Sequence, residues 1–183
     1  MILRWLLLAA ILLALILVPF ALFEESMAER ARDFLTRPQA AWILASGIAA
    51  LLASDLLLPV PSSIVSTAAG ALLGFAAGTL ASWAGMTAGC LIGYWLGLRA
   101  AREPARRILG EEEMLRMVRA QRRWGVWTVL LLRPIPVLAE ASVVFAGMGA
   151  LPFPRFAALA AGSNLVISAV YAYLGAFLGA NWR

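Results

Sequence analysis

Three ionisable residues, Asp55, Arg133 and Glu140, lie within stretches of the chain that are otherwise apolar. At the centre of a bilayer each would cost about 2.5–3.5 kcal/mol on insertion scales, a penalty that persists where the residue has a partner or a task. Arg133 could attract an anion such as a phosphate, and a carboxyl whose pKa is raised by burial could take up and release a proton. Alternatively, Arg133 could pair with Asp55 or Glu140 and only stabilise the fold. We favour the functional interpretation because these charges lie beside predicted helix breaks.

The other chemistry-bearing residues form no catalytic constellation. The sequence contains no histidine, and its single cysteine, Cys90, lies in an apolar, glycine-rich run. The serines therefore lack an imidazole base, and neither a disulfide framework nor a thiolate metal cluster can form. The glycine motifs that bind nucleotide phosphates are also missing from the sequence. We expect a protein that is not an enzyme and has no metal, no cofactor and no nucleic-acid partner.

The composition indicates the environment of these charges. The chain has 183 residues, of which 63% are hydrophobic and 14% charged, whereas soluble domains are roughly 45–50% apolar and about 25% charged. Between Pro38 and Leu98, Asp55 is the only charged residue in 61 positions. Such a chain cannot fold as a soluble domain of this size. We expect an all-α integral membrane protein.

Residues 1–37 are expected to form an anchor and a connector. Trp5–Phe23 is an uncharged run of 19 residues that would just span a hydrocarbon core of roughly 30 Å. A cleaved signal peptide is the alternative, but the run is longer than a usual signal core and no clear cleavage site follows. Glu24–Arg37 fits either an amphipathic interfacial helix or a solvated helical linker.

The first half of the remaining membrane domain (residues 38–183) cannot be one straight helix. Ala40–Ser54 would extend roughly 22 Å as a helix, too short to cross, whereas the uncharged run Ile64–Leu98 would extend about 52 Å, too long for one crossing. Prolines between them remove amide donors and disfavour helix before them. We expect a re-entrant hairpin broken near residues 55–63, then a full span over about Phe75–Leu98. The residues assigned to the tip are Pro59, Pro61, Ser62 and Ser63.

The same pattern recurs in the second half, residues 124–180. Trp124–Leu132 is about half a bilayer long, a tip with Pro134 and Pro136 follows, and Phe156–Ala180 is long enough to span. Irregular backbone at membrane depth is tolerated where it is buried in protein or lines a wet cavity. Each half therefore predicts a re-entrant hairpin plus one span, and a cytoplasmic N-terminus makes the two repeats inverted, as in many transporters.

Residues 99–123 form the one strongly basic stretch, with eight arginines against four glutamates. Positive charge beside a span directs that segment to the cytoplasm, and it also attracts anionic lipid headgroups. We favour the topological interpretation over the lipid-binding one. Both place this loop in the cytoplasm, together with the N-terminus, and the inverted repeat then places the C-terminus outside. The basic residues are all arginine, which is typical of a GC-rich bacterial genome.

Small residues recur every fourth position in the predicted first span. They are Gly85, Gly89, Gly93 and Gly97. Such a ridge lets helix backbones approach closely. We expect the span to pack against the hairpins of the same subunit, and the spacing does not define an oligomeric state.

With these motifs the sequence resembles the DedA family, part of the VTT-domain or SNARE-associated Golgi protein superfamily, over roughly residues 40–179. The resemblance depends on an acid ahead of a proline-containing tip, a glycine-spaced span with an aromatic end, and an arginine–proline tip followed by an acid and a glycine. In this sequence these are Asp55 to Pro61, Gly93-Tyr94-Trp95-Leu96-Gly97, and Leu132 to Pro136 with Glu140 and Gly147.

The family is associated with moving lipids between leaflets, including polyprenyl phosphate and phosphatidylethanolamine in bacteria. The resemblance implies a flippase-like or scramblase-like protein of the bacterial inner membrane, with membrane lipids and, as in some bacterial members, protons as partners. By similarity Asp55 is the acid of the first hairpin and Arg133 the arginine of the second. Ser62 and Ser63 stand where family members often carry a second acid. Glu140 stands near the position where those members carry a second arginine. The alternatives are a proton-coupled transporter of small solutes or ions, and a non-transporting envelope-homeostasis protein.

Overall fold

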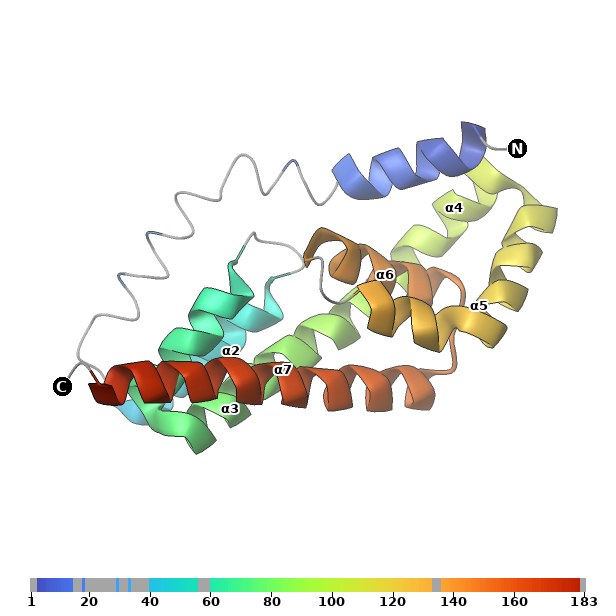
Figure 1. Cartoon of the computed structure of the whole chain (residues 1–183). Coiled ribbons are helices and arrows are strands. Elements are labelled where there is room, and N and C mark those ends of the chain that lie inside the picture. Colours follow the sequence, from blue (N-terminus) through green and yellow to red (C-terminus); the bar gives the residue numbers. More distant parts are fainter. Residues whose placement is uncertain are drawn as a thin grey trace. The chain divides into compact units, whose positions relative to one another are not determined.

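The computed structural model describes residues 3–14, 18, 29, 33, 40–55, 60–132 and 136–181. These residues are helical apart from short connections, and no strand occurs among them. The helices are α2 (Ala41–Ala53), α3 (Ser62–Leu96), a π-helical turn η1 (Gly97–Ala101), α4 (Arg102–Leu109), α5 (Glu111–Leu132), α6 (Pro136–Met148) and α7 (Phe153–Asn181) (Figure 1). A further helix covers Leu3–Ala14.

Two compact units make up the chain. The first consists of Met1–Val18 and Cys90–Leu159 and is called the basic unit here, because it contains the arginine-rich stretch. The second consists of Pro19–Gly89 and Ala160–Arg183 and is called the apolar unit. Each unit therefore combines one part of α3 with one part of α7.

The first helical break in the apolar unit lies where the proline-containing segment predicts it. Helix α2 ends at Ala53 and α3 begins at Ser62. A second break follows at Gly74, whose backbone (φ 79°, ψ 171°) is not helical and divides α3 into residues 62–73 and 75–96. A positive φ of this kind suits glycine, which has no Cβ to clash. The helix after Gly74 therefore starts at Phe75, the residue at which the span was expected to begin.

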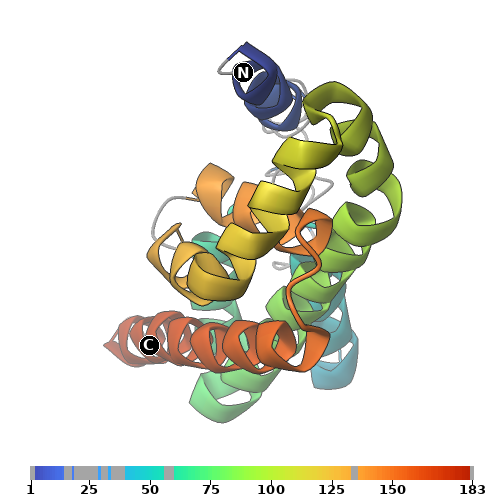
Figure 2. The same cartoon turned by 90° about the vertical axis from the view of Figure 1, so that its right-hand side faces the viewer.

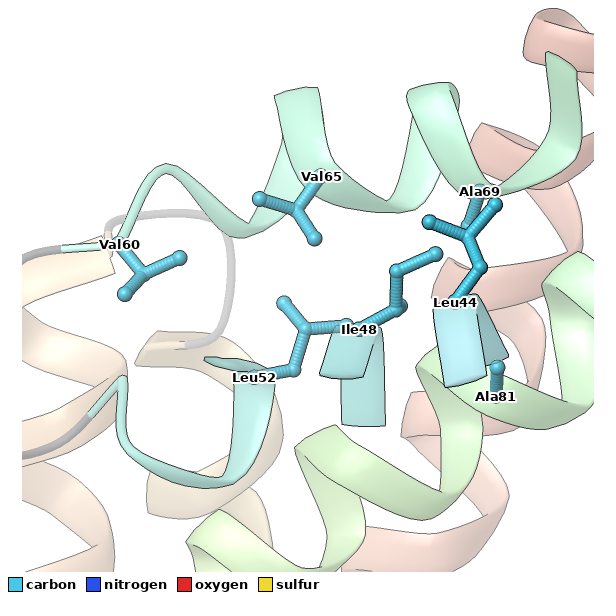
Figure 3. Packing of buried hydrophobic residues seen from close by; sticks show 7 residues of the cluster. All are labelled: Leu44, Ile48, Leu52, Val60, Val65, Ala69 and Ala81. Atoms are coloured by element: carbon cyan, nitrogen blue, oxygen red, sulfur yellow. The ribbon is translucent and has the colours of Figure 1, made fainter. Parts of the chain in front are cut away.

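Helix α2 packs along the first limb of α3 as an antiparallel pair. Leu44, Ile48 and Leu52 occupy one face of α2 and meet Val65 and Ala69 of α3 (Figure 3). In Figure 3 Leu44 lies toward Ala69, and Leu52 lies at the opposite end of this row. Lipid tails are as apolar as these side chains, so in a bilayer close van der Waals packing, rather than removal from water, would hold such a pair together.

The basic stretch is helical, and its last helix continues beyond the stretch, which corrects one expectation. Helix α5 begins at Glu111 and continues without interruption to Leu132. The expected separate half-helix Trp124–Leu132 is thus the C-terminal part of α5. The helix break comes earlier, at Gly110, where φ is 88°. A change from charged to apolar composition does not end a helix, because neither type of residue removes backbone hydrogen bonds.

Helix α6 begins at Pro136 and so includes a residue assigned to the second tip. Proline is well tolerated in the first turn of a helix, where its missing N–H has no intrahelical partner. Helix α6 packs against η1 and α5, and α4 packs against α5 (Figures 1 and 2). Helix α7 starts at Phe153, one turn before the expected start at Phe156.

The N-terminal helix of the basic unit lies beside α4 and α5. The Arg4 guanidinium donates to the carbonyl of Leu109 at 3.4 Å, and the Trp5 indole donates to the Glu113 carboxylate at 3.2 Å. Leu8 is buried against apolar residues of the same region. Apart from residues 18, 29 and 33, the rest of the predicted anchor and the connector Glu24–Arg37 lie outside the described residues.

Two of the described helical segments are long and apolar enough to cross a membrane: Ser62–Leu109, which contains the break at Gly74, and Phe153–Leu178. Large apolar side chains are exposed along both, as expected for surfaces that face lipid. Examples are Leu80, Ile92, Val166, Val170 and Phe177. The length and apolar composition of these helices and the exposure of their apolar side chains thus support the assignment to a membrane protein.

Gly175→Ala should lower the thermal stability of the protein, whereas Gly162→Ala on the same helix should not. A Cβ at Gly175 would collide with the carbonyl oxygen of Thr67, whereas a Cβ at Gly162 meets nothing within 4 Å. Overpacking costs about 1–3 kcal/mol, so we expect the melting temperature of the Gly175 variant to fall by about 3–10 °C. Thermal unfolding in detergent measures both, and equal melting temperatures would contradict the close helix contact.

Candidate functional site

Asp55 lies in the turn that ends α2, in the apolar unit, and its side chain is half-buried. The carboxylate accepts hydrogen bonds from the backbone N–H of Val60 and from the hydroxyl of Ser62. Since Ser62 is the first residue of α3, the carboxylate links the two arms of the helical hairpin across the break. It also lies near the start of α3, where free backbone N–H groups favour a negative charge.

The neighbouring tip residues have hydroxyl side chains. Ser62 and Ser63 are half-buried, and the carbonyl of Ser63 accepts a hydrogen bond from Thr67 at 2.8 Å. Two further predicted tip residues, Pro59 and Pro134, lie outside the described residues, while Pro61 directly precedes α3. The described tip of the first hairpin therefore combines one carboxylate with two hydroxyl groups.

A groove runs from this tip between the first limb of α3 and the C-terminal part of α7. Its volume is about 550 Å³, and its lining is mostly apolar. Ser63, Thr67 and Tyr171 contribute the polar side chains, and Ile64, Ala68 and Leu178 are among the apolar ones. Both helical segments belong to the apolar unit. Ser63 belongs both to the tip and to the groove. The polar tip therefore adjoins the apolar groove.

Of the other two ionisable candidates, the structure describes Glu140 but not Arg133. Glu140 lies in α6 of the basic unit and is half-buried. Arg133 lies outside the described residues, in the segment between α5 and α6. The pairing of Arg133 with Asp55 or Glu140 therefore stays a prediction.

Three of the four spaced glycines contact neighbouring helices, each within its own unit. A Cβ on Gly85 or Gly89 would meet the backbone of α2, and a Cβ on Gly97 would collide with the carbonyl oxygen of Val144 in α6. Gly93 is buried. The absence of a side chain at Gly85, Gly89 and Gly97 is what lets these helices approach.

Sequence reasoning missed a set of buried polar side chains in α3 and α7 of the apolar unit. They are Ser66, Thr79, Ser82, Asn164 and Ser168. The Asn164 amide donates to the Thr87 hydroxyl at 3.3 Å. Within the described part of the chain, the hydroxyls of Ser66, Thr79 and Ser82 have no hydrogen-bond partner. An asparagine inside a long apolar run was the available signal, because buried amides in a membrane need partners.

An aromatic cluster in the basic unit connects the end of α3 with the start of α7. The Tyr94 hydroxyl donates to the carbonyl of Leu151 at 2.7 Å. Its ring stacks on Phe156 with centroids 4.7 Å apart, and Phe153 lies 5.6 Å away. Tyr94 thus holds the turn between α6 and α7 against α3.

Comparison with known proteins gives one family match. The model of the VTT domain matches residues 60–179. No curated protein and no solved structure matches the chain. The matched region begins at Val60, five residues after Asp55, and includes the groove, the basic stretch and Glu140.

Proposed function

Because the chain belongs to the VTT-domain family of DedA and SNARE-associated Golgi proteins, we propose that it moves an anionic-headgroup lipid between membrane leaflets. Polyprenyl phosphate and phospholipids are the candidate lipids. Family membership supports a transporter-like role in a membrane. The observation that carries the lipid assignment is the continuity between the polar tip at Asp55, Ser62 and Ser63 and the apolar groove.

This combination suits a molecule that is polar at one end and apolar along its length. A headgroup would be bound by the polar side chains at the tip, and its chain would lie in the groove between α3 and α7. The exposed Ile64 and Leu178 lie at the groove and would contact neighbouring lipid. A small polar solute would gain nothing from such a lining, because apolar walls cannot replace its hydrogen bonds to water.

The proposal includes the arrangement in the membrane. The pair formed by α2 and the first limb of α3 would be a re-entrant hairpin, and α5 with α6 the second one in an inverted repeat. Helix ends at mid-membrane suit anionic groups, and such broken helices are a common construction of transport sites. Arg133 would then attract the phosphate, with the N-terminus and the arginine-rich stretch in the cytoplasm of a bacterium.

A second candidate function has its own supporting observation. The buried hydroxyls of Ser66, Thr79 and Ser82 would suit a path for protons or small polar species through the apolar unit. Polar residues inside membrane segments often mark such paths. This favours a proton-coupled transporter of small solutes or ions as the alternative.

Reconstitution of the full chain into liposomes tests the proposal. Fluorescent analogues of phosphatidylglycerol, phosphatidylethanolamine, phosphatidylcholine and polyprenyl phosphate are incorporated into both leaflets, and a membrane-impermeant quencher is added outside. We expect quenching of at least one phosphate-bearing lipid beyond the outer-leaflet share, at a rate well above that of protein-free liposomes. Uptake of a solute driven by a proton gradient, with no lipid movement, would instead establish the alternative.

A further inference from the structure

A second pocket lies in the basic unit, where the apolar part of α3 ends. It is formed by η1, α4 and α5 and has a volume of about 390 Å³. Arg99, Arg102 and Arg106 line one side, and Leu98, Leu115 and Val118 contribute apolar walls. All of these residues belong to the basic unit, so the pocket is complete within it.

The carboxylates at this pocket are engaged by one of its arginines. Arg106 forms ion pairs with Glu103 at 3.1 Å and with Glu111 at 3.0 Å. Among the described residues, neither Arg99 nor Arg102 forms an ion pair with a carboxylate. Two guanidinium groups one helical turn apart therefore keep their charge for an external anion.

The first of these guanidinium groups is positioned by an aromatic ring. The Arg99 guanidinium carbon lies 5.0 Å from the centroid of the Trp95 ring. Cation–π stacking on a ring restricts the long side chain and leaves its N–H groups free to donate. Arginine matches the oxygens of phosphates and carboxylates with parallel N–H donors, and phosphate is the anion of this kind that membrane lipid headgroups carry.

The apolar walls distinguish this pocket from a site for a soluble anion. Leu115 is an apolar residue among the charged residues of α5, and its side chain is 55% exposed. Trp95, 42% exposed, marks the boundary at which aromatic residues meet lipid headgroups in membrane proteins. An anion bound here would have an apolar surface next to it that only an attached hydrocarbon chain can cover.

We infer that the pocket between η1, α4 and α5 binds the phosphate of an anionic membrane lipid. Arg99 and Arg102 contact the phosphate, and Leu115 and Val118 contact the first part of the lipid's hydrocarbon chain. The bound lipid is a resident of the cytoplasmic headgroup layer and is separate from the lipid moved at the hairpin tip. The inference does not depend on transport.

Native mass spectrometry of the full chain in detergent tests the inference. The protein is titrated with phosphatidylglycerol or phosphatidylcholine. The double variant Arg99→Gln/Arg102→Gln is compared with Arg119→Gln/Arg122→Gln, which removes the same charge from exposed positions of α5 outside the pocket. We expect phosphatidylglycerol affinity to fall about tenfold in the first variant and less than twofold in the second, with phosphatidylcholine bound weakly by all.

Two additional measurements complete the test. Leu115→Glu places a negative charge at the exposed apolar wall without touching the protein interior, and we expect the same loss of phosphatidylglycerol binding. Equal losses in both double variants, or none in the pocket variants, would overturn the assignment. Displacement of phosphatidylglycerol by millimolar inorganic phosphate would make the ligand a free phosphate and likewise overturn the lipid assignment. These experiments measure lipid binding and not lipid movement. A negative result in the liposome transport assay would therefore not affect them.

Discussion

Replacing Asp55 by asparagine should reduce lipid movement in liposomes at least tenfold while leaving the amount of folded protein unchanged. The carboxylate accepts hydrogen bonds from the Val60 N–H and the Ser62 hydroxyl. An asparagine side-chain carbonyl can still accept from these donors, so the hairpin tip stays closed, but the negative charge and the site for a proton are lost. Interactions of a charged group are worth about 1.5–3 kcal/mol, which corresponds to a factor of about ten or more.

Ser62→Ala is a milder change at the same tip. It removes one donor to the Asp55 carboxylate but keeps the charge and the N–H of Val60. We expect its transport rate to fall by less than that of Asp55→Asn, because one hydrogen bond at the tip is lost while the charge remains. Initial quenching rates and size-exclusion profiles measure activity and folding separately. If Asp55→Asn lost folded protein in proportion to activity, Asp55 would be a structural link between α2 and α3 and not part of a transport site.

The helix breaks of the first half were predictable because their causes are local. Length limits and prolines required a break after Ser54, and α2 ends at Ala53 while the next helix begins at Ser62. Gly74 could not be recognised as a break from its residue type alone, but the excess length of Ile64–Leu98 required one near it. The lengths of apolar runs are therefore the most informative part of this sequence.

Features that depend on distant contacts were not predictable. Gly125 does not interrupt α5; it faces Gln121 and Leu151, and a Cβ there would meet the Gln121 side chain. Sequence shows a glycine in a helix and gives no sign of such a neighbour. In the same way, burial of Ser82 and Ser168 depends on the packing of α3 against α7 in the apolar unit, which has no local signature.

The sequence likeness between the two halves shows the same limit at a single pair of residues. Tyr94 and Tyr173 occupy similar positions in the two halves, each shortly before a glycine, Gly97 or Gly175. Yet Tyr94 is 3% exposed and Tyr173 is 59% exposed. The sequence likeness therefore identifies two related aromatic positions but not which of them supports the fold.

Tyr94→Ala should lower the melting temperature by about 10 °C or more, the largest loss of stability that we expect of any single change. Removal of a buried aromatic side chain costs about 3–5 kcal/mol, and each kcal/mol corresponds to about 2–4 °C in a chain of this size. The substitution removes the ring that stacks on Phe156 and the donor to the Leu151 carbonyl. Thermal unfolding in detergent, followed by the fraction of protein that remains monodisperse, measures the loss.

The corresponding phenylalanine variants separate the ring from the hydroxyl. Tyr94→Phe keeps the stack on Phe156 and leaves the Leu151 carbonyl without its donor, so we expect a fall of about 2–4 °C for roughly one hydrogen bond. Tyr173→Phe changes the exposed tyrosine at the similar position of the other half and should leave the melting temperature unchanged. Equal shifts for the two phenylalanine variants would mean that the Tyr94 hydroxyl does not hold the turn between α6 and α7, because an exposed hydroxyl has water or headgroups as partners in either state.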